Sequence, residues 1–228
     1  MRAVAFDFGQ TLAELDYQFV GARLAERGHA FEQARAAAGA EHAWQLYGEL
    51  KAEGHAVAWL AMMQAQLEAG GVPPESAPSL ASWLWQEQPK KNLWRKPIPG
   101  MIELVRELRS AGAKLAVISN SEGHLAELID ELGWSDAFHV VVDSGRVGID
   151  KPDARIFQHA CRALGVEPGE LLHVGDAWEA DVQGALGAGA SAVWFDARYA
   201  ERTLPERAYG ADGPRSLREI LARLGLVS

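Results

Sequence analysis

The stretch Ala3-Val4-Ala5-Phe6-Asp7-Phe8-Gly9-Gln10-Thr11-Leu12 joins a short apolar run directly to an acid and a turn. Further apolar runs follow it along the chain, at residues 115–118, 140–142, 171–174 and 192–195. Each is short, contains branched or aromatic side chains, and is followed at once by Ser, Asp or Gly. Short runs that are apolar throughout are typical of strands covered on both faces, so this pattern predicts a parallel sheet.

Helical patterns lie between the later runs. Apolar residues recur at helical spacing in residues 101–108, 125–132, 154–164 and 182–188. Gly112, Gly133 and Gly165 stand where three of these helices should end, since glycine readily adopts the left-handed conformation that closes a helix. The alternation of strand and helix predicts βαβ units. We therefore expect an α/β fold whose core is a doubly wound, Rossmann-like parallel sheet.

Residues 15–96 interrupt this alternation. They are rich in Ala, Glu, Gln, Leu, Arg and Trp, and no strand pattern is visible in them. Gly28 and the turn Gly70-Gly71-Val72-Pro73-Pro74 divide the segment into several helices. We expect an all-helical cap subdomain at 15–96, inserted into an α/β core made of residues 1–14 and 97–228. The tail after Asp196 is expected to be a loop followed by a short helix near residues 217–224.

Composition narrows the possible partners. Of the 228 residues, 48% are hydrophobic and 23% are charged, which is ordinary for a folded domain with its own core. The net charge of -9 opposes binding to nucleic acid or to an anionic membrane. No secretory signal is apparent, no apolar stretch is long enough to span a bilayer, and Cys161 has no cysteine to pair with. We expect a cytoplasmic monomer or homodimer.

Polar side chains that could bind ligands or take part in catalysis follow the predicted strands. They are Asp7, Ser119, Asp176 and Asp181, with Lys151 in the segment after the third strand. Ligands of open parallel sheets bind at the carboxyl ends of the strands, so we expect these side chains to converge. Carboxylates suit a hard cation, whereas a lysine and a hydroxyl suit an anion. The set therefore predicts a site for an anion together with a bound cation.

The order of these residues resembles the haloacid dehalogenase-like hydrolase superfamily, most of whose members are phosphatases. The resemblance covers the whole chain, including a helical cap inserted after the first strand. Asp7, with Thr11 and Leu12, matches the nucleophile motif. Ser119 matches the Ser/Thr of the second motif, and Lys151 before Pro152 matches the lysine of the third. Gly175-Asp176 with Asp181 matches the acidic fourth motif.

The resemblance implies a Mg²⁺-dependent phosphatase acting on a small phosphorylated metabolite. Asp7 would be the nucleophile and form an aspartyl-phosphate. Asp7, the backbone carbonyl of Gly9 and Asp176 would hold Mg²⁺, with Asp181 assisting through water or from outside the ligand shell. Lys151 would neutralise the phosphoryl group, with Lys151 and Ser119 as catalytic partners of Asp7. The residues expected to bind the phosphate are Thr11, Ser119, Asn120 and Lys151.

The sequence departs from this family pattern at Gly9. Phosphatases of the superfamily carry an acid/base aspartate at this position, two residues after the nucleophile, and loss of such a group typically costs roughly 100- to 10,000-fold in rate. One explanation is that Asp16, Glu14 or a cap histidine supplies the proton. Another is a substrate whose leaving group needs no acid, such as an acyl phosphate.

The remaining explanations for Gly9 are a different reaction or no catalysis. Haloacid dehalogenases lack the second aspartate because halide leaves unprotonated. Phosphonatases also lack it and use a cap lysine as a Schiff base, a role for which Lys51 is the candidate. A non-catalytic relative that binds metal and a phosphorylated ligand is the last alternative.

Several residues are expected to serve the fold rather than the site. His173 lies in a predicted strand and should be a hydrogen-bonded core residue. Cys161 lies on a predicted helix and should be buried in packing. The cap tryptophans should pack between helices. They are Trp44, Trp59, Trp83 and Trp85.

Overall fold

A computed structural model describes residues 1–53, 55 and 57–227. Within them, six parallel strands form one sheet in the order β5-β4-β1-β6-β7-β8. The strand bounds are β1 (Ala3–Phe6), β4 (Lys114–Ser119), β5 (Val140–Asp143), β6 (Leu171–Gly175), β7 (Ser191–Phe195) and β8 (Ala208–Ala211). The predicted Rossmann-like α/β core is confirmed, and the five runs expected to be strands all lie in this sheet.

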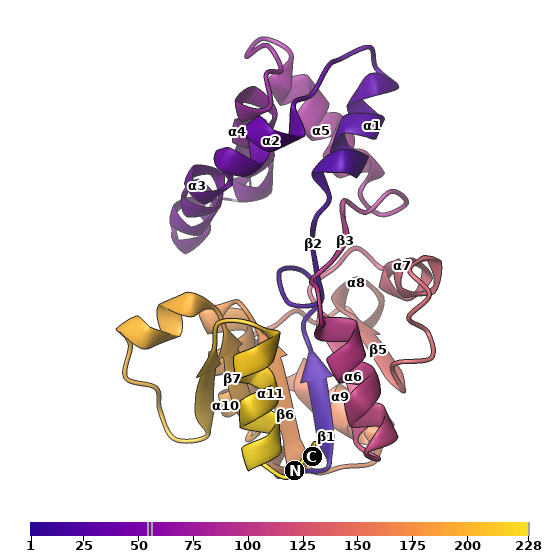
Figure 1. The fold of residues 1–228 in the computed structure, drawn as a ribbon, viewed down its shortest axis with the longest axis vertical. Helices are drawn as coiled ribbons and strands as arrows, with labels where there is room; N and C mark the ends of the chain where they lie inside the picture. Colours follow the sequence, from indigo (N-terminus) through magenta and orange to yellow (C-terminus); the bar gives the residue numbers. More distant parts are fainter. Residues whose placement is uncertain (54, 56, 228) are drawn as a thin grey trace. The chain divides into compact units, whose positions relative to one another are not determined.

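Helices cover both faces of the sheet (Figure 1). On one face lie α6 (Met101–Ser110), α7 (Leu125–Glu131) and α11 (Pro214–Arg223). On the other lie α9 (Ala154–Leu164) and α10 (Gly184–Gly187). Successive strand residues point to opposite faces, so Val4 and Phe6 join the first cluster while Ala3 and Ala5 join the second. This two-sided burial explains why the strands are apolar throughout.

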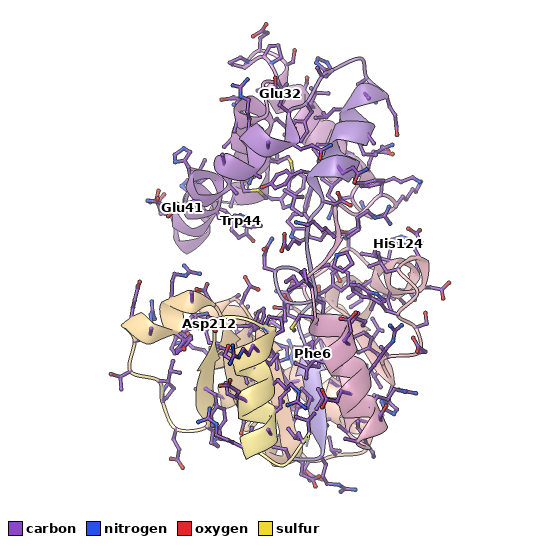
Figure 2. The ribbon with its side chains drawn as sticks, in the orientation of Figure 1. Phe6, Glu32, Glu41, Trp44, His124 and Asp212 are labelled. Atoms are coloured by element: carbon purple, nitrogen blue, oxygen red, sulfur yellow. The ribbon has the colours of Figure 1, made fainter. Side chains whose placement is uncertain are left out.

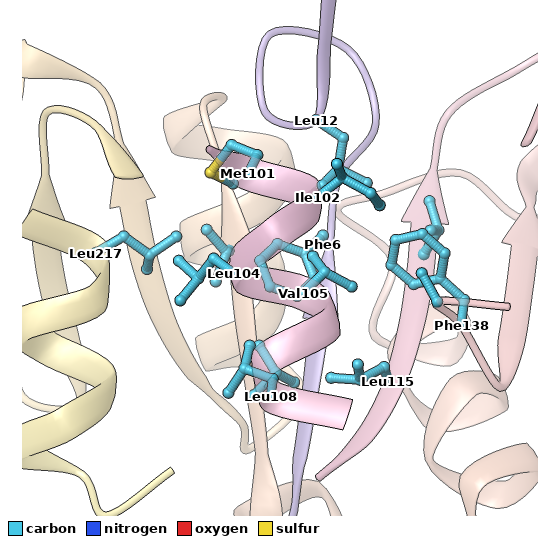
Figure 3. Packing of buried hydrophobic residues seen from close by; sticks show 14 of the residues in the cluster. Phe6, Leu12, Met101, Ile102, Leu104, Val105, Leu108, Leu115, Phe138 and Leu217 are labelled. Atoms are coloured by element: carbon cyan, nitrogen blue, oxygen red, sulfur yellow. The ribbon is translucent and has the colours of Figure 1, made fainter. Parts of the chain in front are cut away.

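The helix α6 shows how the layers pack (Figure 3). Its apolar stripe, Met101, Leu104, Val105 and Leu108, is buried against the sheet, and Leu217 of α11 lies beside Leu104. Burial of one such side chain stabilises the fold by about 1.5–3 kcal/mol. The helix therefore fixes the position of β1, whose end carries Asp7.

The chain divides into two compact units. One comprises Met1–Leu15 and Trp94–Ser228, and the other comprises Asp16–Leu93. The described part of the second unit is helical. Its helices are α1 (Tyr17–Ala25), α2 (Gln33–Ala38), α3 (Ala40–Ala52), α4 (Ala58–Ala69) and α5 (Ala77–Glu87). Among the described residues, no helix is both long and apolar enough to cross a membrane.

The tryptophans of the helical unit pack against other side chains of that unit. Trp44 of α3 (labelled in Figure 2) meets Tyr47 edge to face. The rings of Trp59 and Trp85 lie 4.9 Å apart, although Trp85 keeps 42% of its surface exposed. Trp83 lies beneath the Arg23 guanidinium. The expectation of packing between helices is confirmed for Trp59, Trp83 and Trp85, whereas the contact of Trp44 with Tyr47 lies within α3.

Two expectations about strands were wrong. Residues 94–96 were predicted to be helical, but β3 (Trp94–Pro97) pairs antiparallel with β2 (Ala13–Leu15). The tail after Asp196 was expected to be a loop before its final helix, but it contains β8 at the sheet edge. Both strands are short, and three of the four residues of β8 are Ala or Gly, which are depleted in strands. Pairing with neighbouring strands decides their conformation.

Candidate active site

Asp7 lies at the carboxyl end of β1, the strand that pairs with both β4 and β6. Its backbone N–H donates to the Val174 carbonyl at 2.8 Å, so the chain stays in register until the acid. A tight turn follows, in which the Leu12 and Ala13 N–H groups both donate to the Phe8 carbonyl. Gln10 takes the left-handed conformation there, with φ of 55°. The turn places the Asp7 carboxylate at the rim of the sheet.

Lys151 connects the carboxylates. Its Nζ donates to Asp7 Oδ1 at 2.6 Å, to Asp181 Oδ1 at 2.6 Å and to the Ile118 carbonyl at 2.8 Å, which uses all three ammonium protons. Burial alone would lower the pKa of Lys151, but the charges of Asp181 and Asp7 outweigh it and the pKa is raised. Lys151 is therefore a buried permanent cation.

The side chain of Asn120 forms hydrogen bonds with both the backbone N–H and the carbonyl of Lys151. Its side-chain Oδ1 accepts from the Lys151 N–H at 2.7 Å, and its Nδ2 donates to the Lys151 carbonyl at 3.0 Å. The peptide bond between Lys151 and Pro152 is cis. The side chain of Asn120, predicted to bind substrate, is thus occupied in holding the lysine. Its backbone N–H remains a candidate phosphate donor.

Asp181 is saturated by protein donors. Its Oδ1 accepts from Lys151 and from His173 Nε2 at 2.9 Å, and its Oδ2 accepts from the Ala177 N–H at 2.9 Å. An ionised carboxylate only accepts, so His173 carries its proton on Nε2. Burial would raise the pKa of Asp181, but Lys151 and then His173 outweigh it and lower the pKa. His173 is the buried, hydrogen-bonded residue expected, but its partner is a predicted site residue.

The backbone conformation around Asp181 lets its side chain lie close to the end of β6. Asp181 lies in a π-helical segment, η2 (Trp178–Gln183), which begins three residues after β6. The helix expected over 182–188 thus starts earlier and with a different period. A Cβ on Gly175 would lie 2.3 Å from Asp181 Cγ, so glycine is required there.

The third carboxylate, Asp176, completes an acidic cluster. One carboxylate oxygen from each of Asp7, Asp176 and Asp181 lies within 4.8 Å of the others. Burial raises the pKa of Asp176 well above its usual range, and the negative charges of Asp7 and Asp181 raise it further. The cluster holds three carboxylates and one lysine in contact, so it is short of positive charge. Oxygen donors at this spacing fit a hard cation such as Mg²⁺.

Ser119 and Thr11 carry the hydroxyls that were predicted to bind phosphate, and each lies at or after the carboxyl end of a strand, β4 and β1 respectively. Ser119 is the last residue of β4 and is buried. Thr11 is fully buried in the turn after Asp7, and its Oγ1 has no hydrogen-bond partner among the described residues. A buried hydroxyl without a partner is costly in a folded protein, which is consistent with a group that meets a ligand.

Asp143 is a structural residue at this rim that sequence reasoning missed. Its Oδ1 accepts from the Gly123 and Gly145 N–H groups at 3.0 Å, and its Oδ2 accepts from the Leu125 N–H at 2.9 Å. It therefore holds the loop that follows Ser119. The signal was present, because Asp143 directly follows an apolar run, as Asp7 does, and Asp176 follows its run after one glycine.

Trp94 lies beside Gly9. A Cβ on Gly9 would lie 3.3 Å from Cδ1 of the Trp94 indole and 3.5 Å from its Nε1. The glycine therefore faces an aromatic ring of β3 at the position where the family pattern has its second aspartate. Neither the strand at 94–97 nor this contact has a signature in the sequence.

The alternative proton donors have other roles within their own units. Asp16 caps α1 by accepting from the Phe19 N–H at 3.0 Å. Glu14 forms an exposed ion pair with Lys96 at 3.1 Å. The side chain of Lys51, the Schiff-base candidate, lies outside the described residues. Cys161 is buried on α9, as expected.

Comparison with known proteins shows the family to which this chain belongs. A sequence model of the haloacid dehalogenase-like hydrolases matches residues 1–189. Phosphoserine phosphatase of Thermus thermophilus is 40% identical over 134 residues, which are 58% of this chain and 52% of that protein. Glyceraldehyde 3-phosphate phosphatase of Methanopyrus kandleri is 41% identical over 100 residues, 43% of each chain. The chain spans about half the length of the curated relatives it matches.

Solved structures agree over nearly the whole chain. A 2-haloacid dehalogenase from Pseudomonas syringae is 26% identical with a TM-score of 0.58, covering 98% of this chain and 99% of that one. A HAD phosphatase from Thermococcus onnurineus is 25% identical with a TM-score of 0.60, covering 97% and 98%. The chain belongs to the haloacid dehalogenase-like hydrolases. The curated relatives that it matches include phosphatases.

Proposed function

We propose that this hydrolase is a Mg²⁺-dependent phosphatase of a small phosphorylated compound, acting through an aspartyl-phosphate on Asp7. The observation that carries the proposal is the contact of Lys151 with both Asp7 and Asp181, beside Asp176. A buried cation next to a strand-end carboxylate suits transfer of an anionic group, because the charge is already in place before substrate arrives. The phosphatases among the relatives support the same reaction class.

The residues divide the chemistry between them. An oxygen of Asp7 attacks phosphorus, the bond to the leaving oxygen breaks, and the leaving group takes that electron pair. Lys151 holds the Asp7 carboxylate in place and neutralises charge on the phosphoryl group. Ser119, Thr11 and the backbone N–H of Asn120 orient the phosphoryl oxygens. Water then attacks the phosphorus and gives its proton to solvent or to a phosphate oxygen. The bond between phosphorus and the Asp7 oxygen breaks, its electron pair returns to the Asp7 carboxylate, and inorganic phosphate is released.

A cation would be held by Asp7, Asp176 and the carbonyl of Gly9. Asp181 would act from outside the ligand shell, since its oxygens already accept three hydrogen bonds from the protein. When bound, Mg²⁺ supplies positive charge for the phosphate oxygens and offsets the repulsion among the carboxylates. Without the cation, burial and then the charges of Asp7 and Asp181 raise the pKa of Asp176.

Gly9 limits the substrates that this site can hydrolyse. The space beside it is bounded by the Trp94 indole, which carries no titratable group. We therefore propose that substrates have leaving groups that depart without protonation, such as aryl or acyl phosphates. The helical unit, Asp16–Leu93, would form the cap that excludes water and selects the substrate in a cytoplasmic enzyme.

A panel of phosphates tests the proposal. Hydrolysis of acetyl phosphate, an aryl phosphate and an alkyl phosphate would be measured with Mg²⁺ and with EDTA. We expect Mg²⁺-dependent release of phosphate from the first two, at least 100-fold slower release from the third, and loss of activity in Asp7→Asn. A folded protein that hydrolyses none of them, but binds Mg²⁺, would favour a binding protein. Turnover of a 2-chloro acid instead would favour dehalogenation.

A further inference from the structure

Two tryptophans and an arginine form a platform beside Asp176. The rings of Trp178 and Trp194 lie 4.9 Å apart at an interplanar angle of 59°. The guanidinium carbon of Arg202 lies 5.1 Å from the centroid of Trp178 and 5.5 Å from that of Trp194. Cation–π contact with two rings restrains a guanidinium and leaves N–H donors free to bind a ligand.

The charge of Arg202 is not neutralised by the protein. The side chain is exposed, and within the described residues it has no ion pair and no side-chain hydrogen bond. Arg198, on the same segment, differs in this respect. Its Nε and Nη2 bind both carboxylate oxygens of Asp196, so its fork is occupied. Of the two arginines on this platform, Arg202 is the one available to a ligand.

The platform is fixed to the acidic cluster. Trp194 Nε1 donates to the Asp176 carbonyl at 2.8 Å, and Trp194 is only 2% exposed. Trp178 begins the π-helical segment that carries Asp181. The hydrogen bonds of Asp196 raise the pKa of Arg198, and the charge of Asp176 adds to that rise, so the segment lies within electrostatic reach of the site.

We propose that Arg202, held on Trp178 and Trp194, binds a second anionic group of the substrate, a carboxylate or a second phosphate, distinct from the phosphate that is cleaved. A guanidinium pairs with either group through two parallel hydrogen bonds. The inference rests on the proposed function, because it names a substrate class for the same site. Substrates would then be phosphates that carry a further negative charge on the leaving group.

Matched aryl phosphates test the proposal on the full-length protein. The probes are 4-carboxyphenyl phosphate, its neutral analogue 4-carbamoylphenyl phosphate, and 1,4-phenylene bisphosphate. We expect Arg202→Gln to raise KM about tenfold for either doubly anionic probe and to leave the neutral one within about twofold. Arg202→Lys should recover only part of the loss, because it keeps the charge without the planar fork. Arg215→Gln, on α11 with a 97% exposed side chain, is the matched control and should change nothing.

Binding separates this inference from the proposed reaction. The dissociation constants of 4-carboxyphenylphosphonate and its carbamoyl analogue would be measured by calorimetry and by tryptophan fluorescence. Discrimination that is lost in Arg202→Gln supports the inference even if no phosphate is hydrolysed. Turnover with equal loss, or no loss, for charged and neutral probes overturns the inference and leaves the phosphatase in place. If only the bisphosphate responds, the second group is phosphate.

Discussion

At the scale of single residues, Lys151 is the side chain on which the site depends. It is buried, and its three protons are donated to Asp7, Asp181 and the Ile118 carbonyl. A buried ion pair contributes little when intact, but removal of one partner leaves the other charge without compensation. Lys151 thus couples the chemistry of the site to the stability of the core.

Substitution Lys151→Met should lower the free energy of unfolding by about 3–5 kcal/mol, because Asp7 and Asp181 then face each other without a cation. Urea denaturation at neutral pH measures this. The control is Lys96→Met, which removes an exposed ion pair with Glu14 and should cost less than about 1 kcal/mol. Addition of Asp181→Asn to Lys151→Met should recover part of the loss. Equal effects of the two lysine substitutions would contradict this account.

Asp176 should oppose folding when no cation is present. Its folded-state pKa is raised, whereas the unfolded value is about 3.9, so the folded protein binds the extra proton in between. Stability in EDTA therefore falls as the pH rises from about 4 through the raised pKa. Asp176→Asn should be more stable than the natural chain at pH 7, and this difference should vanish towards pH 4.

Thermal unfolding in EDTA across this pH range checks the expectation. The matched measurement adds Mg²⁺, which should raise the melting temperature of the natural chain and have little effect on Asp176→Asn. If Asp176→Asn lowers stability at pH 7 in EDTA, the favourable contacts of the Asp176 carboxylate outweigh its repulsion by Asp7 and Asp181, and the expectation is wrong.

At the scale of elements, the approach of the π-helical segment to β6 controls the position of Asp181. Gly175→Ala would place a methyl group 2.3 Å from Asp181 Cγ and force the two elements apart. We expect a loss of about 2–3 kcal/mol in stability and a large drop in phosphate release. Gly187→Ala is the control, since a Cβ there meets nothing within 4 Å. Urea denaturation of both variants would refute the argument if their losses were equal.

At the scale of the molecule, the α/β unit has a core of its own. Both of its hydrophobic clusters are made of residues from Met1–Leu15 and Trp94–Ser228. The ends of the helical insert are also adjacent, because Leu15 pairs with Trp94 across β2 and β3. The insert can therefore be replaced by a short turn without reaching across the fold.

Residues 1–15 joined to 94–228 through an Asn-Gly turn should fold cooperatively. Thermal unfolding followed by circular dichroism measures this. The same protein should show a Mg²⁺-dependent rise in melting temperature, because all three carboxylates of the cluster lie in this unit. The full-length chain is the control. A broad, non-cooperative transition would mean that the core needs the helical unit.

Most of the features that were predicted correctly follow from local sequence patterns. The buried strands, their helices and the strand-end residues Asp7, Ser119 and Asp176 follow from apolar runs and what comes next to them. The β2–β3 pair and β8 could not be found in this way, since cross-strand pairing rather than composition stabilises them. Asp143 was missed because its role, to hold the loop after Ser119, involves residues about 20 positions away.

The sequence by itself determined the α/β class, the family and the set of carboxylates, hydroxyl and lysine at the strand ends. Alternation of strand and helix brings such residues to one rim wherever parallel strands form. Only the tertiary structure decided which groups are in contact: Lys151 with Asp181, His173 behind Asp181, Trp94 beside Gly9, and Arg202 over two tryptophans. These contacts join residues from different elements, and their geometry depends on packing and desolvation that no local pattern records.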